Sequence, residues 1–191
     1  MVNAGLSEHN IQVLRGLIGD QLIRFRSQEI DNWGKVYGNL EIISNDKRIE
    51  IQNEQRPMMF FGDIEDVATF NVIEKKIDEK FEPMVLDVPI IDYEIKDQIV
   101  NISIINDRIE VFNNTDELIY SISMDMGMVF HMMNQILVFS KGWYFDESIN
   151  IIRDKNYLEK IRTIDQVKRD WIDPEIDEGY VKCFRNEIFI K

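Results

Sequence analysis

Few side chains in this chain of 191 residues could act as nucleophiles, bases or metal ligands, since it has two histidines and one cysteine. His131 lies in the apolar stretch Val-Phe-His-Met-Met-Asn, where it could be a general base or bind a metal ion. No second histidine, cysteine or acid cluster lies near it at the spacing that metal sites use. Cys183 would need a neighbouring base to become a nucleophile. We therefore expect both to be buried structural side chains, with no metal and no cofactor.

Paired carboxylates are a second source of possible chemistry. Asp63, Glu65 and Asp66 lie close together in the sequence, and Asp146 is followed by Glu147. Glycoside hydrolases use two carboxylates, one as an acid and the other as a base or nucleophile. Such pairs also arise by chance in a chain with 35 acidic residues. The favoured interpretation is a protein without catalytic activity, and a hydrolase that uses carboxylates or a divalent metal is the alternative.

An acidic loop near the end of the sequence matches a calcium site only in part. Residues 173–179, Asp-Pro-Glu-Ile-Asp-Glu-Gly, carry acids at the first, third and fifth positions of a calcium loop. The glycine comes one position late, and Phe184 stands where the loop needs a glutamate. Glycine motifs that cradle nucleotide phosphates are also missing from the sequence. The sequence therefore predicts neither an EF-hand nor a nucleotide site.

The segment 142–147, Gly-Trp-Tyr-Phe-Asp-Glu, has the composition of a binding surface. Three consecutive aromatic residues on a strand point to both of its faces, so at least one faces outward or lies under a helix. Aromatic rings anchor protein interfaces, and carboxylates steer a basic partner toward them. The alternative is a strand that is packed on both faces. The expected contact residues are Trp143, Tyr144, Asp146, Glu147, Asp173, Glu175, Asp177 and Glu178.

The net charge restricts the possible partners. Lys and Arg number 22 and Asp and Glu number 35, so that the formal charge is 22 − 35 = −13. Such a charge repels nucleic acids and anionic lipids and attracts basic proteins. No uncharged apolar run reaches the ~18 residues that a membrane helix needs. The beginning of the sequence lacks a signal-peptide pattern, and the single cysteine is typical of a reducing compartment. We expect a cytoplasmic protein with a basic protein partner.

The pattern of apolar residues predicts mostly strands. Over residues 95–152, short runs of Ile, Val, Phe, Tyr and Met are separated by Asn-Asp, Asn-Asn-Thr-Asp, Asp-Met-Gly and Lys-Gly. This pattern predicts a meander of antiparallel strands. A hairpin is expected over residues 36–53 and two closing strands at 180–183 and 187–191. Five methionines lie within residues 124–133; we interpret them as core residues, with an adaptable binding surface as the alternative.

Two regions of the sequence have helical spacing. Ser7 can cap a helix over residues 7–18. Apolar residues from Leu158 to Trp171 fall near one helical face, and Thr163 with Gln166 forms a capping box where this helix can restart. The expected fold class is α+β, a mostly antiparallel β meander with an N-terminal helix and one or two C-terminal helices.

Two segments of the sequence resemble each other. Residues 39–53 align with residues 101–113 if two one-residue gaps are allowed, which could reflect a duplicated β unit. A competing alignment matches residues 18–25 with residues 95–102 at a different offset. Both cannot hold in one rigid duplication, and hairpins resemble one another because their turns need the same residue types. The duplication therefore remains open.

We expect one compact domain over residues 1–191. If the chain divides, Pro83 and Pro89 mark the boundary between an N-terminal part, 1–80, and a C-terminal part, 90–191. Proline within a strand is confined to sheet edges. This segment is therefore expected to be an edge strand or an extended connector, and a module that assembles through such an edge is a further alternative function.

Three segments give the chain a resemblance to a known class of proteins. They are Leu-Ile-Gly-Asp-Gln-Leu at 17–22, Val-Tyr-Gly-Asn-Leu-Glu-Ile at 36–42 and Gly-Trp-Tyr-Phe-Asp-Glu-Ser-Ile at 142–149. In general character the chain resembles the small acidic α+β immunity proteins that bacteria encode beside toxins. The resemblance implies a cytoplasmic protein that covers the active site of a basic toxin or nuclease and has no catalysis of its own.

Overall fold

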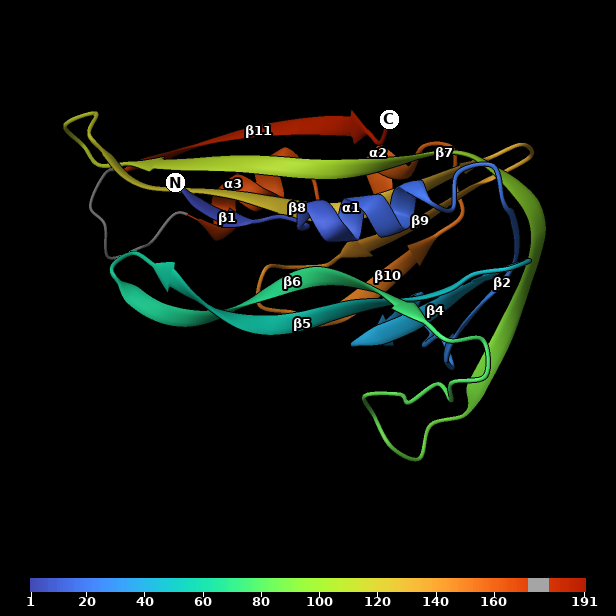
Figure 1. Ribbon diagram of the computed structural model, residues 1–191. Helices are drawn as coiled ribbons and strands as arrows, with labels where there is room; N and C mark the ends of the chain where they lie inside the picture. Colours follow the sequence, from blue (N-terminus) through green and yellow to red (C-terminus); the bar gives the residue numbers. More distant parts are fainter. Residues whose placement is uncertain (172–178) are drawn as a thin grey trace.

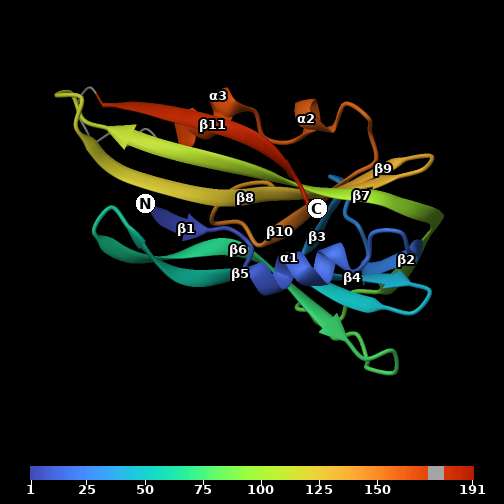
Figure 2. The ribbon, with the colours of Figure 1, turned by 45° about the horizontal axis from the view of Figure 1, so that its top comes forward.

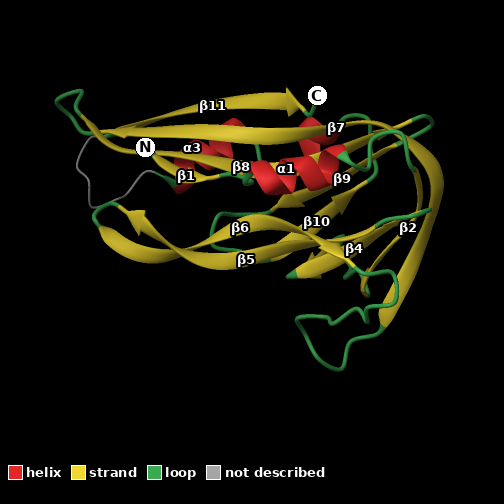
Figure 3. Ribbon diagram, in the orientation of Figure 1, coloured by secondary structure: helices red, strands yellow, loops and turns green. Residues whose placement is uncertain are grey.

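The computed structural model describes residues 1–171 and 179–191, and it shows a largely all-β protein (Figures 1 and 3). Strands make up 57% and helices 10%, so the expected α+β class is wrong. The strands are β1 Val2–Ala4, β2 Gln21–Gln28, β3 Lys35–Tyr37, β4 Asn39–Ser44, β5 Arg48–Phe60, β6 Asp63–Lys75, β7 Ile90–Phe112, β8 Leu118–Met132, β9 Ile136–Lys141, β10 Ser148–Ile152 and β11 Tyr180–Phe189. The helices are α1 Glu8–Arg15, α2 Tyr157–Lys160 and α3 Ile164–Asp170.

The antiparallel strands are present, but they are longer than the sequence pattern indicates. β7 has 23 residues and runs straight through Asn106 and Asp107, although this pair is typical of a turn. The side chain of Asp107 accepts hydrogen bonds from Arg185 at 2.6 and 2.7 Å, and Asn106 Nδ2 donates to Asp125 at 2.8 Å. These contacts with distant strands satisfy the polar side chains of both residues while their backbone stays extended. The predicted turn at this pair is therefore wrong.

All eleven strands belong to one sheet that folds back into two layers (Figures 1 and 2). The main path is β3-β10-β9-β8-β7-β2-β4-β5-β6, while β1 pairs with β8 in parallel and β11 pairs with β7 in antiparallel fashion. β7 belongs to both layers, since residues 90–98 pair with β2 and residues 99–112 with β8. Strand twist accumulates in so large a sheet and favours curling. The β5–β6 hairpin therefore lies opposite β7 and β8 (Figure 1).

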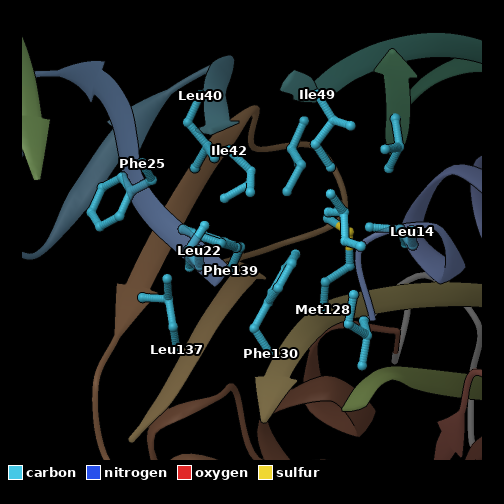
Figure 4. Close-up of a cluster of buried hydrophobic side chains, with 14 of the residues drawn as sticks. Leu14, Leu22, Phe25, Leu40, Ile42, Ile49, Met128, Phe130, Leu137 and Phe139 are labelled. Atoms are coloured by element: carbon cyan, nitrogen blue, oxygen red, sulfur yellow. The ribbon is translucent and has the colours of Figure 1, made fainter. Parts of the chain in front are cut away.

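Apolar side chains between the layers form the main core (Figure 4). Phe130 of β8 and Phe139 of β9 lie edge to face, with ring centroids 5.6 Å apart. Leu40 and Ile42 of β4 belong to the same buried cluster, and Leu14 of α1 completes it. A second cluster lies under α2, α3 and the tip of the β5–β6 hairpin. Four of the five clustered methionines are buried, namely Met124, Met126, Met128 and Met132, whereas Met133 is exposed.

The helices are shorter than predicted. α1 begins with a capping box, in which Ser7 Oγ accepts from the backbone N–H of Asn10 and Asn10 Oδ1 accepts from the N–H of Ser7. It ends at Arg15, and Gly16 is its C-cap. The C-terminal segment forms two short helices because Ile161 has an extended backbone. α3 then starts from the predicted capping box of Thr163 and Gln166.

The structure decides three other interpretations of the sequence. Residues 81–89 contain no strand, so the segment between Pro83 and Pro89 is a connector and not an edge strand. The two predicted closing strands form one strand, β11. Residues 39–53 form the β4–β5 hairpin and residues 101–112 lie within β7, so the two similar segments have different structures.

Among the described residues, the helices are all too short or too polar to cross a membrane.

Candidate functional site

The predicted contact residues of segment 142–147 lie in the loop between β9 and β10 instead of on a strand. Trp143 is 39% exposed, whereas Tyr144 is only 4% exposed and its hydroxyl donates to the carbonyl of Asp170 at 2.7 Å. Trp143 is therefore available to a partner and Tyr144 is part of the core. The other predicted contact residues, Asp173, Glu175, Asp177 and Glu178, lie outside the described residues.

Asp146 and Glu147 are half-buried and hold the loop in place. Asp146 accepts from the backbone N–H of Ser148 at 2.8 Å and from its hydroxyl at 2.5 Å, and Lys35 Nζ lies 3.8 Å away. Glu147 accepts a hydrogen bond from the Tyr37 hydroxyl, and this bond raises the pKa of Tyr37 above its ordinary value. These two carboxylates therefore have partners within the chain.

The β5–β6 hairpin packs beside this loop. Asn53 Nδ2 donates to the carbonyl of Asp146 at 2.9 Å, and Gln55 Nε2 donates to the carbonyl of Phe145 at 3.2 Å. The ring of Phe60 lies 5.4 Å from that of Phe145. The loop and the hairpin thus form one continuous surface, although about 90 residues separate them in the sequence.

The tip of this hairpin carries acids that no cation neutralises. Asp63, Glu65 and Asp66 are exposed and have no ion pair among the described residues. Met59 and Ile64 are 51% and 71% exposed and lie directly opposite each other in the register of β5 and β6. We call this group, together with Trp143, the acidic hairpin surface. It combines apolar anchors with free carboxylates, and it is our candidate functional site.

His131 belongs to a polar cluster that sequence reasoning missed. Ser103 Oγ lies 2.8 Å from His131 Nε2 and donates to Glu187 Oε1 at 2.5 Å, and Nε2 lies 3.2 Å from the same oxygen. In a serine hydrolase the histidine bridges serine and acid through its two nitrogens. Here one nitrogen faces both groups, and Ser103 is fully buried. Because these residues come from three different strands, no local sequence signal could have revealed the cluster.

Tyr157 of α2 completes this cluster. Its hydroxyl donates to both oxygens of Glu187, at 2.8 and 2.9 Å. Burial, supported by this bond, raises the pKa of Tyr157 above its ordinary value. The carboxylate of Glu187 thus receives hydrogen bonds from β7 and α2. We interpret the cluster as a structural contact that fastens β11 and α2 to the sheet.

Cavities also lie elsewhere on the described part of the chain. One of about 420 Å³ lies beside α3 and is lined by Ile105, Leu158, Thr163, Ile164, Asp165, Arg185 and Glu187. A wide, open hollow of about 580 Å³ is lined by Asp46, Glu74, Lys75, Lys76, Ile77 and Asp78. The smallest of these, about 150 Å³, is lined by Arg24, Arg26, Ile43, Ser44, Asn45, Lys47, Arg48 and Ile77. Arg185 and Glu187 in the cavity beside α3, and Arg24, Arg26, Lys47 and Arg48 in the smallest one, have partners within the chain. Glu41, the partner of Arg48, is buried, and burial raises its pKa despite the hydrogen bonds from Arg48.

Lys141 is a fully buried ammonium group between the two layers. Its Nζ donates to the carbonyl of Ala68 at 2.8 Å and lies 5.0 Å from the centre of the Phe70 ring. Burial lowers the pKa of Lys141 from 10.5 to about 8. Lysines with lowered pKa occur at catalytic sites. Lys141 lines none of these cavities, and its contacts join β9 to β6, so we assign it a structural role.

The buried charge of Lys141 predicts a dependence of stability on pH. Between the folded pKa, about 8, and the ordinary value of 10.5, the unfolded state binds more protons than the folded state. Stability therefore rises with pH in this window, by about 1 kcal/mol from pH 7 to pH 9. Urea unfolding at these pH values measures the rise, and Lys141→Met should abolish it. Above pH 9 Cys183 opposes this rise in stability. Burial raises the pKa of its thiol from 9.0 to about 11, so in this range the folded state keeps a proton that the unfolded state loses.

Neither a metal site nor a known relative adds to this description. Within residues 1–171 and 179–191, no three His, Cys, Asp or Glu side chains come together as metal ligands would. Cys183 is buried under α3 and lies beside Arg185. Comparisons with protein-family models, curated proteins and solved structures give no match.

Proposed function

We propose that the chain is a non-catalytic acidic protein that binds a basic protein partner through the acidic hairpin surface. One observation carries this proposal: Asp63, Glu65 and Asp66 are exposed, have no ion pair within the described part of the chain, and lie directly beside exposed Ile64. Free carboxylates attract a basic protein and orient it during the encounter. Exposed apolar side chains then supply the contacts that hold it, since these dominate binding energy.

The kind of partner follows from charge and from the resemblance to immunity proteins. A protein with a net charge of −13 is attracted over long distances to a basic surface such as the phosphate-binding site of a nuclease. An inhibitor that covers this site needs no catalytic residues. We therefore propose an immunity-type inhibitor of a basic toxin or nuclease that acts in the cytoplasm. The hydrolase alternative has less support, because Asp63, Glu65 and Asp66 line none of the cavities described above.

Neutralising the hairpin acids should weaken binding. In the variant Asp63→Asn/Glu65→Gln/Asp66→Asn, we expect affinity for the product of the adjacent gene, co-expressed with the chain, to fall about tenfold or more at low salt. The reason is the loss of three charges that face the partner. Titration calorimetry at low and moderate salt measures the effect, and the wild-type affinity should itself fall as salt rises.

A matched control variant distinguishes the contribution of the acidic hairpin surface to affinity from that of the net charge. The variant Glu74→Gln/Asp78→Asn/Glu82→Gln also removes three exposed carboxylates, which lie away from the hairpin tip. We expect it to keep most of the affinity. Equal losses in both variants would mean that only the overall charge matters. A wild-type chain that stays free of the co-expressed protein at low salt would refute the proposal.

A further inference from the structure

β11 forms an outer edge of the sheet. All ten of its residues pair with β7 in one unbroken register, from Tyr180 opposite Phe112 to Phe189 opposite Ser103. Figures 1 and 2 show β11 along the outside of β7, with no strand beyond it. In the described part of the chain, the backbone groups on its other side have no recorded partner.

The alternation of the backbone identifies the free groups. The N–H of Ile190 donates to the carbonyl of Ile102 at 2.9 Å, in the same register as the rest of β11. Since successive residues of a strand direct their N–H and C=O groups to opposite sides, even-numbered residues bond to β7. The odd-numbered residues Val181, Cys183, Arg185, Glu187 and Phe189 therefore present their backbone groups to the free edge.

This edge has little of the usual protection against pairing. Natural proteins protect edge strands with proline, bulges, charges or covering segments. β11 has no proline or glycine, its register shows no bulge, and Lys182 is its one exposed charged side chain. Phe184 and Ile188 are 48% and 53% exposed on the face that α3 leaves open. By contrast, part of the free side of β6 is used, since the N–H of Ala68 donates to the carbonyl of Tyr144.

We propose that a second copy of this chain pairs with β11 in antiparallel fashion about a two-fold axis at Asn186. In this register Phe184 lies opposite Ile188 of the second copy. This apolar pair forms twice by symmetry, and such cross-strand pairs stabilise sheets. The sheets of the two copies then continue into one another.

The charge of the edge favours a second copy over a basic partner. Residues 180–191 carry three cationic side chains and one carboxylate, in a chain whose net charge is −13. A basic strand would meet like charges here, whereas two copies bring together segments that are less acidic than the chain as a whole. The remaining acids still repel each other across the dimer. Salt screens this repulsion, so the dimer should strengthen as salt rises, opposite to the complex proposed above.

Sedimentation equilibrium at low and high salt tests this inference. We expect a monomer–dimer equilibrium that shifts toward the dimer as salt rises. Phe184→Lys, which places a cation at the centre of the pairing face, should weaken the dimer at least tenfold. Ile90→Lys is the matched control, because Ile90 is 45% exposed at the other end of the sheet, and it should leave the dimer unchanged. Circular dichroism checks that both variants fold.

A cysteine cross-link tests the register. Asn186 lies opposite its own copy, so Asn186→Cys should form an intermolecular disulfide under oxidising conditions, whereas Ile90→Cys should not. A chain that remains monomeric at high concentration in both salts would overturn the inference. A dimer that Phe184→Lys does not weaken, or that Asn186→Cys does not cross-link, would also overturn it, because association would then use another surface.

Discussion

Replacing Asp107 with alanine is expected to lower the free energy of unfolding by about 3–5 kcal/mol, because it breaks a buried ion pair. The carboxylate of Asp107 is fully buried and accepts from Arg185 Nε at 2.7 Å and from Arg185 Nη2 at 2.6 Å. Without it, Arg185 keeps its charge in a largely buried position. The carbonyl of Arg162, which accepts from Nη1 at 2.8 Å, is the other recorded partner of its guanidinium.

Urea unfolding at neutral pH measures this loss. Asp78→Ala is the control, because Asp78 is exposed and has no recorded ion pair among the described residues; it should change stability by less than about 0.5 kcal/mol. The double variant Asp107→Ala/Arg185→Met should lose less than Asp107→Ala alone, since no uncompensated charge remains buried. A loss below about 1 kcal/mol in Asp107→Ala would show that this pair does not hold β11 to the sheet.

Local signals predicted local structure. The capping boxes of Ser7 and of Thr163 lie within four residues of sequence, and both helices start where the sequence indicates. The number and length of the strands depended on distant partners. Asn106 and Asp107 resemble a turn, but pairing with β8 and β11 and the contact with Arg185, 78 residues away, keep the backbone extended. The expected α+β class is wrong because the helices are short and because β7 and β8 continue through residues that are typical of turns.

The sequence indicates the two parts of the candidate site separately but does not indicate that they lie together. The composition of segment 142–147 indicated a binding surface, and Asp63, Glu65 and Asp66 were noted only as carboxylates that could do chemistry. Nothing in the sequence placed them together, because the contact between them comes from the packing of β5 on the β9–β10 loop. The cluster of Ser103, His131 and Glu187 likewise needs the order of three strands. Pairing between distant strands thus determines both sites.

Phe60 connects the acidic hairpin surface to the body of the protein. Its ring lies 5.0–6.5 Å from five others, those of Phe61, Tyr120, Tyr144, Phe145 and Trp171. The hydroxyl of Tyr120 also donates to the carbonyl of Met59 at 2.9 Å. The side chain of Met59, by contrast, points to solvent. Neighbouring residues of β5 therefore provide a matched pair, one that packs on the core and one that does not.

Phe60→Ala is expected to lower the free energy of unfolding by about 3 kcal/mol, the lower end of the range for phenylalanine because the side chain is only partly buried. Met59→Ala should cost less than about 0.5 kcal/mol. Urea unfolding compares the two variants, and hydrogen exchange should show faster opening at the hairpin tip in Phe60→Ala alone. Because this variant changes no charge, a loss of partner affinity would mean that the carboxylates must be held in position beside Trp143. Equal stability and exchange in the two variants would instead show that the hairpin is held by its backbone contacts alone.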